Sequence, residues 1–573
     1  MKIIFQGLKN IFILSKGQRY SIFILSCLVF ITPFLEVFGI SMLAPLSALA
    51  VGGNLESIKF INRINTFVPL EFTNFNNIAV LILIIILIRI NVNILLVYLR
   101  SKISVNFRTD WTKTIISSAM YSKYSTLSKE RLGSFLETIS SETRKASNSL
   151  IGLVQLIERS LLSFLLISGL IITSPELTIA IILFLFIVLF ILKKSGLFNS
   201  YKRGKKLQKY SQLITIASSD ILSNIRQIKL FNIYDRSLKV VEDSLNKYSK
   251  ERIIFEVSNQ IPRIFLESSL TIISILVLMY IYNQKDANLI DSIPNITILI
   301  VFGGRLANVF SSISKGYIDL NIGLANIESV FKRIFPKDNL EDIHTGKNLV
   351  EIKNHIKFKK VSYSWPDSNN KTINDVSITF KKGLNLIKGP SGSGKSTLLN
   401  LILGLIKPDS GIILFDNERL DSYNLKTIRS SISIVTQEDE LIYGTIAENI
   451  RMSSPLISDN DVFEAAKFAK ADQFIKQLPK QYETIISEKG SNLSGGQRQR
   501  LSLARSIVQP KSVYIFDEVT NSLDKKTETL VQKTINDIAL NAIVIQISHL
   551  ESTSIHADKV FQFDNLGNLK ILS

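Results

Sequence analysis

The chain has 573 residues, of which 46% are hydrophobic and 20% charged, and its mean hydropathy is +0.24. This length favours two or more folding units, and the composition indicates that one unit is apolar and another is solvated. The formal charge of +19 would also suit nucleic-acid binding. Lys and Arg flank the apolar runs, however, as in the cytoplasmic loops of membrane proteins, so we expect no nucleic-acid partner. Cys27 is the only cysteine, which excludes an intrachain disulfide and a cysteine-based metal cluster.

Six apolar runs are long enough to be membrane-spanning helices, each of which needs about 20 apolar residues. They are Tyr20 to Leu43, Asn77 to Leu99, Leu150 to Thr173, Leu177 to Leu192, Ile264 to Tyr282 and Ile293 to Ser312. The first run follows a basic stretch, but it is longer than the apolar region of a signal peptide and has no clear small-residue cleavage pattern. We therefore expect a multi-pass protein with a cytoplasmic N-terminus.

Two long connections between these runs, Arg100 to Ser149 and Lys193 to Arg263, are rich in Lys and Arg. Basic loops are typical of the cytoplasmic side of a membrane. Both connections have apolar residues at helical spacing and little Pro or Gly, which predicts helices that extend beyond the bilayer. We place their turning points at Ser122 to Gly133 and Ala217 to Phe231, where short helices could press on a partner domain.

A polar linker follows the sixth run, and after it short apolar segments alternate with turn signals. The predicted organisation is a transmembrane domain over residues 1–335, a linker over 336–350 and a soluble domain over 351–573. The predicted fold class is multi-domain, with an all-α domain of six transmembrane helices and a soluble α/β domain.

The soluble domain contains a phosphate-loop sequence, GPSGSGKST, between a predicted strand (Gly383 to Ile387) and a predicted helix (Ser396 to Leu405). Glycines let backbone amides surround phosphate oxygens, the helix start adds its positive end, and Lys395 supplies a cation. The strand, loop and helix in register argue against a chance glycine turn, so the predicted fold class of the soluble part is an α/β P-loop NTPase domain. The predicted ATP-binding residues are Gly389, Pro390, Ser391, Gly392, Ser393, Gly394, Lys395, Ser396 and Thr397.

The segment VYIFDE, Val513 to Glu518, is predicted to be a buried strand that ends in two acids. At the carboxyl edge of a parallel sheet, Asp517 could hold the shell of a magnesium ion, and Glu518 could orient the attacking water. A strand that ends in solvated acids is common, so this assignment depends on the phosphate loop upstream.

The sequence LSGGQ, Leu493 to Gln497, lies between these two motifs. With the phosphate loop and the acid pair in this order, it resembles the signature of the ABC transporter family. The small residues allow close backbone approach, and Ser494 is predicted to begin a helix whose amino end faces an anion. The resemblance implies that Ser494, Gly495, Gly496 and Gln497 contact the terminal phosphate of an ATP bound to the opposite subunit.

Other residues match this family one at a time. Trp365 corresponds to the aromatic residue that stacks on adenine, usually Tyr, and Gln437 to the glutamine that senses magnesium. Glu488 lies where related exporters have a coupling acid, although Ser487 replaces a usual glycine. Asp524 and His549 match a conserved aspartate and the histidine that contacts the terminal phosphate. The resemblance thus implies ATP and Mg²⁺ as ligands, with Ser396, Gln437 and Asp517 at the metal and Lys395, Gln437, Glu518 and His549 in catalysis.

Six spans before a C-terminal nucleotide domain resemble a type I exporter half-transporter. A single copy of each half implies a homodimer with composite ATP sites, multi-pass in the bacterial inner (plasma) membrane, with the nucleotide domain in the cytoplasm. Soluble repair or translation ATPases share the signature but lack spans, and nothing in the sequence indicates the pore-lining ring of a ligand-gated channel.

The substrate must be inferred from charges in or beside the apolar runs, which are costly there and therefore candidates for function. These residues either face an anionic or sugar-bearing headgroup or pair with one another. The first span (FLEVFGISMLAPLSAL) and the sixth (GGRLANVFSSI) resemble flippases of lipid-linked oligosaccharides. We expect a lipid-linked glycan or similar amphiphile, and lipid A-like lipid, a hydrophobic drug and a peptide remain alternatives. The charged residues are Glu36, Arg89, Glu158, Arg159, Glu267 and Arg305.

Overall fold

The computed structural model describes most of the chain, in two compact units. The first unit covers residues up to Met120 and Lys129–Asp338, and the second covers Tyr121–Ser128 and Asn339–Ser573. The described residues are 18–50, 75–128, 130–173, 175, 178–179, 182–183, 190, 200–283, 289–335, 346–349, 351–365, 370–437, 441–452, 454, 456–487, 490–520, 525–548, 556–564 and 566–572.

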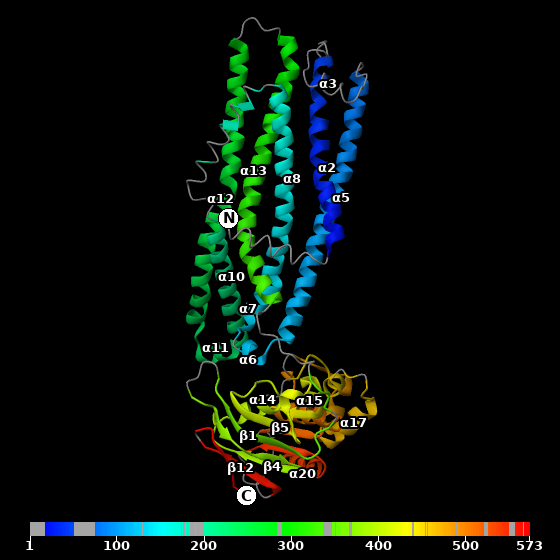
Figure 1. Ribbon diagram of the computed structural model, residues 1–573, viewed down its shortest axis with the longest axis vertical. Helices are drawn as coiled ribbons and strands as arrows, with labels where there is room; N and C mark the ends of the chain where they lie inside the picture. Colours follow the sequence, from blue (N-terminus) through cyan, green and yellow to red (C-terminus); the bar gives the residue numbers. More distant parts are fainter. Residues whose placement is uncertain are drawn as a thin grey trace. The chain divides into compact units, whose positions relative to one another are not determined.

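The first unit is all-helical, and five of the six predicted spans lie in its helices. Of the described residues, three stretches are long and apolar enough to cross a membrane: Tyr20–Ala50, Phe75–Met120 and Leu132–Ile172. The run Leu177 to Leu192 lies mostly outside the described residues. The long helices α8 and α13 lie side by side (Figure 1). The helices are α2 (Arg19–Ser41), α3 (Leu43–Ala50), α5 (Phe75–Met120), α8 (Thr143–Thr173), α10 (Ser200–Ser223), α12 (Tyr234–Asn283) and α13 (Leu289–Ile334).

The helices continue well past the apolar runs, as the sequence predicts. Helix α5 reaches Met120, and α12 begins at Tyr234, far before its apolar part. Short helices lie at both predicted turning points. In the first unit these are α7 (Leu132–Glu137) and α11 (Ile225–Phe231), whereas α6 (Tyr124–Leu127) belongs to the second unit. A π-helix, Thr138–Glu142, joins α7 to α8.

Glycines allow the extended helices to approach closely. A Cβ on Gly133 of α7 would lie 2.7 Å from the Cα of Ile216 on α10. A Cβ on Gly204 of α10 would lie 2.8 Å from the Cα of Ile322 on α13. No larger residue fits at these positions without moving a backbone, so α10 is held tightly against both neighbours.

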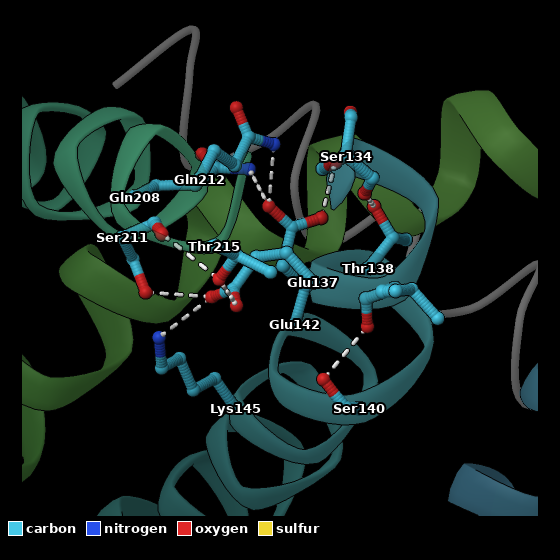
Figure 2. A network of polar contacts seen from close by, with 12 residues as sticks. Ser134, Glu137, Thr138, Ser140, Glu142, Lys145, Gln208, Ser211, Gln212 and Thr215 are labelled. Atoms are coloured by element: carbon cyan, nitrogen blue, oxygen red, sulfur yellow. Dashed lines mark hydrogen bonds and ion pairs between the residues drawn. The ribbon is translucent and has the colours of Figure 1, made fainter. Parts of the chain in front are cut away.

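Two buried carboxylates, Glu137 and Glu142, join α10 to the α7–α8 segment (Figure 2). Glu142 is fully buried and accepts hydrogen bonds from Gln208 and Gln212, both at 2.8 Å. A third bond, from Ser329 of α13, is 2.6 Å long. Glu137 accepts from Ser211 at 2.6 Å and Thr215 at 2.8 Å, and Lys145 lies 3.7 Å from it. A polar stripe of α10 therefore satisfies both acids, as burial of a carboxylate requires.

The second unit contains two large sheets. The six-stranded sheet has the order β13-β12-β4-β11-β10-β7 and is parallel except at β13. The other is antiparallel, with the order β2-β1-β5-β6 and β3 paired to β1. The strands are β1 (His355–Tyr363), β2 (Ile373–Val376), β3 (Thr379–Lys381), β4 (Gly383–Lys388), β5 (Ser410–Phe415), β6 (Glu418–Arg419), β7 (Ile432–Val435), β8 (Gly444–Thr445), β9 (Ile485–Ile486), β10 (Val513–Asp517), β11 (Ile543–Ile547), β12 (Lys559–Phe563) and β13 (Leu569–Ile571).

Helices cover these sheets and divide the core of the unit into two clusters. One cluster packs α14 between the two sheets, and the other gathers α16 to α20 against the opposite side of the parallel sheet. This α/β architecture and the helical first unit confirm the predicted fold class. The helices are α14 (Lys395–Ile402), α15 (Leu425–Ser431), α16 (Ile446–Arg451), α17 (Asp459–Phe468), α18 (Asp472–Gln477), α19 (Gly495–Ile507) and α20 (Lys525–Ala539).

The helix after the phosphate loop is shorter than predicted. It ends at Ile402 rather than Leu405, because Leu403 is its C-cap and Gly404 adopts a left-handed φ of 62°. Glycine at this position ends helices without steric cost, and the apolar residues beyond it do not continue the helix.

Candidate nucleotide site

The parallel sheet brings three predicted motifs to one edge. Strands β4, β11, β10 and β7 are neighbours, with Ile387 opposite Ile547, Ile547 opposite Asp517, and Phe516 opposite Val435. The phosphate loop follows β4, the acid pair ends β10, and Gln437 lies just after β7. Ligands of open parallel sheets bind at the carboxyl ends of the strands, which is this edge.

The phosphate loop has a backbone that only glycine adopts readily. Gly389 and Gly394 have φ of 155° and 106°. A Cβ on Gly394 would lie 2.6 Å from the carbonyl oxygen of Thr372. Helix α14 starts directly after Gly394, and no side chain caps it. Its first amides are therefore available to an anion.

Two side chains of the loop also fit a phosphate. The Ser393 hydroxyl is buried and has no hydrogen-bond partner in the described part of the chain. Lys395 is 8% exposed, and its Nζ donates to the carbonyl oxygens of Gly389 at 2.7 Å and Pro390 at 2.8 Å. Burial lowers the pKa of Lys395, and the charges of Glu518 and Asp517 oppose this shift. The loop thus holds a cation and an unsatisfied donor together, as phosphate binding requires.

Asp517 and Glu518 differ in backbone and surroundings. The strand ends at Asp517, one residue earlier than predicted, because Glu518 turns to a left-handed φ of 53°. This conformation is costly for a non-glycine residue and occurs preferentially at functional sites. The Glu518 amide donates to the Ile547 carbonyl oxygen at 3.0 Å. The side-chain amide of Gln437 donates through Nε2 to Oε2 of Glu518 at 2.9 Å, a contact that the sequence did not predict.

The pKa of Asp517 is raised to about 6 by burial and, next, by the charge of Glu518, while Lys395 lowers it. A carboxylate with this surplus of negative charge is suited to a cation. Ser396, Gln437 and Asp517 offer hydroxyl, amide and carboxylate oxygens, the ligand types that magnesium prefers. Among the described residues, no group of three or more His, Cys, Asp or Glu could hold a metal by itself. A magnesium ion usually keeps water and phosphate ligands, so the oxygen donors of these three residues fit it.

Trp365 lies beside the phosphate loop. Its indole Nε1 donates to the Thr397 hydroxyl at 3.4 Å. Its ring packs edge-on against Tyr363, with centroids 5.5 Å apart. Because the ring is only half-buried, it can offer a surface to a base.

The signature residues occupy a different part of the unit. Ser494 is the N-cap of α19 and forms a capping box with Gln497, as the predicted helix start requires. Helix α19 packs against α16 and α17 in one core cluster, whereas the phosphate-loop helix α14 belongs to the other. Three predicted residues, Glu488, Asp524 and His549, lie outside the described residues.

The charges of the membrane unit pair more extensively than the sequence shows. Glu36 is buried and binds both Arg89, at 3.0 Å, and Arg305. Glu158 pairs with Arg100, which directly follows an apolar run and begins the connection Arg100 to Ser149. Arg159 is half-buried on α8, and the Glu267 side chain lies outside the described residues.

These features define a helical membrane unit joined to a P-loop nucleotide-binding unit that also carries the LSGGQ helix. Two family descriptions match the chain: the ABC transporter transmembrane region over residues 22–319 and the ABC transporter domain over residues 373–521. The chain therefore belongs to the ABC transporter family.

Individual relatives show the same relationship. The chain is 35% identical over 261 residues to ABC transporter B family member 13 of Arabidopsis thaliana, which is 45% of this chain and 20% of that protein. It is 24% identical over 510 residues to the putative ABC transporter ATP-binding protein exp8 of Streptococcus pneumoniae, covering 87% of this chain and 86% of that protein. For six of its curated relatives the chain spans between 12% and 57% of their length.

A solved structure shares the whole fold. The structure of a bacterial Atm1-family ABC exporter with ATP bound matches with a TM-score of 0.75 at 19% identity, over 94% of each chain. The chain therefore shares the fold of that structure, with a membrane unit and a nucleotide-binding unit on one polypeptide.

Proposed function

We propose that the chain hydrolyses ATP and uses the energy to export or flip an amphipathic substrate across the bacterial inner membrane. The observation that carries the ATPase part is the sheet edge where Lys395, Asp517 and the Gln437–Glu518 contact meet the phosphate loop. Phosphoryl transfer depends mainly on positioning and charge stabilisation, and this edge supplies both.

Each residue has a distinct task in this proposal. The loop amides, the Ser393 hydroxyl and Lys395 bind the phosphates, and Trp365 stacks on the adenine. Glu518, oriented by Gln437, holds the attacking water. Asp517, Ser396 and Gln437 would hold Mg²⁺, which neutralises charge on the phosphates when bound. His549 and Asp524 complete the set by family resemblance.

The signature implies a second copy of the chain. Helix α19, which Ser494 caps, and helix α14, which follows the phosphate loop, belong to separate core clusters, and the amino end of α19 is suited to an anion. We infer a homodimer in which the signature of each copy covers the ATP held by the other. Binding would close the dimer and hydrolysis would release it.

For the substrate we favour a lipid-linked oligosaccharide or glycolipid, with an acidic headgroup. Two arginines share one carboxylate, so the Glu36–Arg89–Arg305 cluster carries a net positive charge among apolar helices. The side chains of Arg89 and Arg305 are 27% and 37% exposed, and Nε of Arg89 has no hydrogen-bond partner in the described part of the chain. Arginine binds oxyanions bidentately, so this cluster is suited to phosphate.

ATPase activity in lipid nanodiscs tests this proposal. We expect stimulation by a polyprenyl-diphosphate glycan, and loss of that stimulation but not of basal turnover in Arg305→Gln. The matched variant Arg252→Gln removes an arginine from an exposed ion pair on α12 and should leave stimulation unchanged. Stimulation only by an uncharged drug or a peptide, or by lipid A-like lipid alone, would refute the glycan assignment.

A further inference from the structure

The loop that leads to the signature is held by a hydrogen-bond clasp between Ser487 and Asn492. The Ser487 amide and hydroxyl donate to Oδ1 of Asn492 at 3.1 and 2.9 Å. In return the Asn492 amide donates to the Ser487 hydroxyl at 3.1 Å, and its side-chain Nδ2 donates to the Ile485 carbonyl oxygen at 3.1 Å. The two side chains therefore tie the end of β9 to the residues directly before α19.

The clasp continues directly into the signature helix. The Leu493 amide donates to the Gly490 carbonyl oxygen at 3.0 Å, and Arg498 of α19 donates to the Leu493 carbonyl oxygen at 2.9 Å. Gly490 has a left-handed φ of 67°, and a Cβ there would lie 2.9 Å from Arg498. Ser494, which caps α19, therefore follows a loop whose geometry is fixed at both ends.

At its other end the clasp joins the segment that follows Gln437. Strand β9, which precedes Ser487, pairs with β8, with Gly444 opposite Ile486 and Thr445 opposite Ile485. The Ile446 amide also donates to the Thr484 carbonyl oxygen at 3.0 Å. Thr445 then caps α16 through a capping box with Glu448. The β8–β9 ladder thus connects the chain after Gln437 to the loop before Ser494.

We propose that Ser487 and Asn492 are positioning residues for ATP hydrolysis. They hold the signature loop in register with the β8–β9 ladder. A movement of Gln437 at one nucleotide therefore also moves Ser494, which acts at the second nucleotide of the dimer. Neither residue belongs to the predicted nucleotide-binding set. The action of Ser494 at a second copy's nucleotide rests on the proposed homodimer.

This role differs from one in stability. The hydrogen bonds of the clasp lie at the surface, where water can replace them, so their loss should leave the unit folded. It should instead let the amino end of α19 move. A misplacement of this kind lowers turnover and leaves ground-state nucleotide binding intact.

The test uses the purified full-length chain in nanodiscs, with kcat and KM for ATP measured for Ser487→Ala, Asn492→Ala and the double variant. We expect kcat to fall about three- to tenfold with KM within about twofold of the parent. The double variant should lose no more than the more affected single variant, because the two residues act as one unit. Ser487→Thr keeps a hydroxyl and should restore kcat.

Ser458→Ala is the matched control, because Ser458 also holds a surface loop, in the capping box of α17. Its kcat should match that of the parent. Parental kcat in Ser487→Ala and Asn492→Ala would overturn the proposal, as would an equal loss in the control or additive losses in the double variant. An inactive parent protein would instead refute the proposed function.

Discussion

Removal of the Glu142 carboxylate should destabilise the membrane unit more than neutralisation of its charge. Glu142 is fully buried and accepts three hydrogen bonds, from Gln208, Gln212 and Ser329. Glu142→Ala leaves three donors without an acceptor, at a cost of about 1 kcal/mol or more for each, because the donors are only half-buried. We expect a loss of about 3 kcal/mol in total.

Glu142→Gln has the same shape and keeps an oxygen that accepts from the two glutamines, while its new amide can donate to Ser329. This variant loses only the charge-assisted part of these hydrogen bonds, and we expect its free energy of unfolding to decrease by about 1 kcal/mol. Glu256→Ala removes an exposed glutamate from an i,i+4 ion pair and should cost no more than about 0.5 kcal/mol.

The assay uses the two tryptophans of the chain. Trp111 is buried in the first unit and Trp365 lies in the second, so in a Trp365→Phe background the fluorescence reports unfolding of the first unit alone. A loss of about 1 kcal/mol in the free energy of unfolding lowers the thermal unfolding midpoint of a large domain by about 2 °C. The midpoint of Glu142→Ala should therefore lie about 6 °C below that of the parent. An unchanged midpoint in Glu142→Ala, or an equal fall in Glu142→Gln, would refute the hydrogen-bond argument.

Three further predictions concern the nucleotide site. Glu518→Gln should retain ATP binding, trap the closed dimer and reduce turnover at least about 100-fold in a phosphate-release assay; normal hydrolysis would remove Glu518 from its role. Trp365→Ala should weaken nucleotide affinity about tenfold or less with little change in kcat, measured by titration with a fluorescent ATP analogue, and an unchanged affinity would indicate another adenine platform. Because the pKa of Asp517 is about 6, its carboxylate becomes protonated as the pH falls through 6, so Mg²⁺-dependent ATPase activity should decline there. Between its ordinary pKa of 3.8 and about 6 the native state binds the extra proton, so the contribution of Asp517 to stability decreases as the pH rises through this window. A pH profile that Asp517→Asn leaves unchanged in shape would contradict this assignment.

The local motifs could be predicted because their physics is contained in a few adjacent residues. The strand and glycine loop before Lys395, and the helix start at Ser494, follow from spacing and backbone preference, and the structure has both. The turning points at α7 and α11 follow from the lengths of the apolar runs and the basic connections between them.

Contacts between distant segments could not be predicted in the same way. Gln437 and Glu518 are brought together by strand order, and Glu142 meets Gln208 and Ser329 only through helix packing. The partner of Glu158 was missed because Arg100, just outside an apolar run, has the spacing of a solvated flank. Such pairings depend on tertiary geometry, which periodicity along the chain does not contain.

ATP-dependent movement of a fluorescent polyprenyl-diphosphate glycan between the leaflets of proteoliposomes tests the central claim most directly. The purified chain should move this lipid only when ATP and Mg²⁺ are present, and Glu518→Gln should abolish the movement. Movement that proceeds at the same rate without ATP, or that Glu518→Gln leaves intact, would contradict the coupling of the nucleotide site to transport.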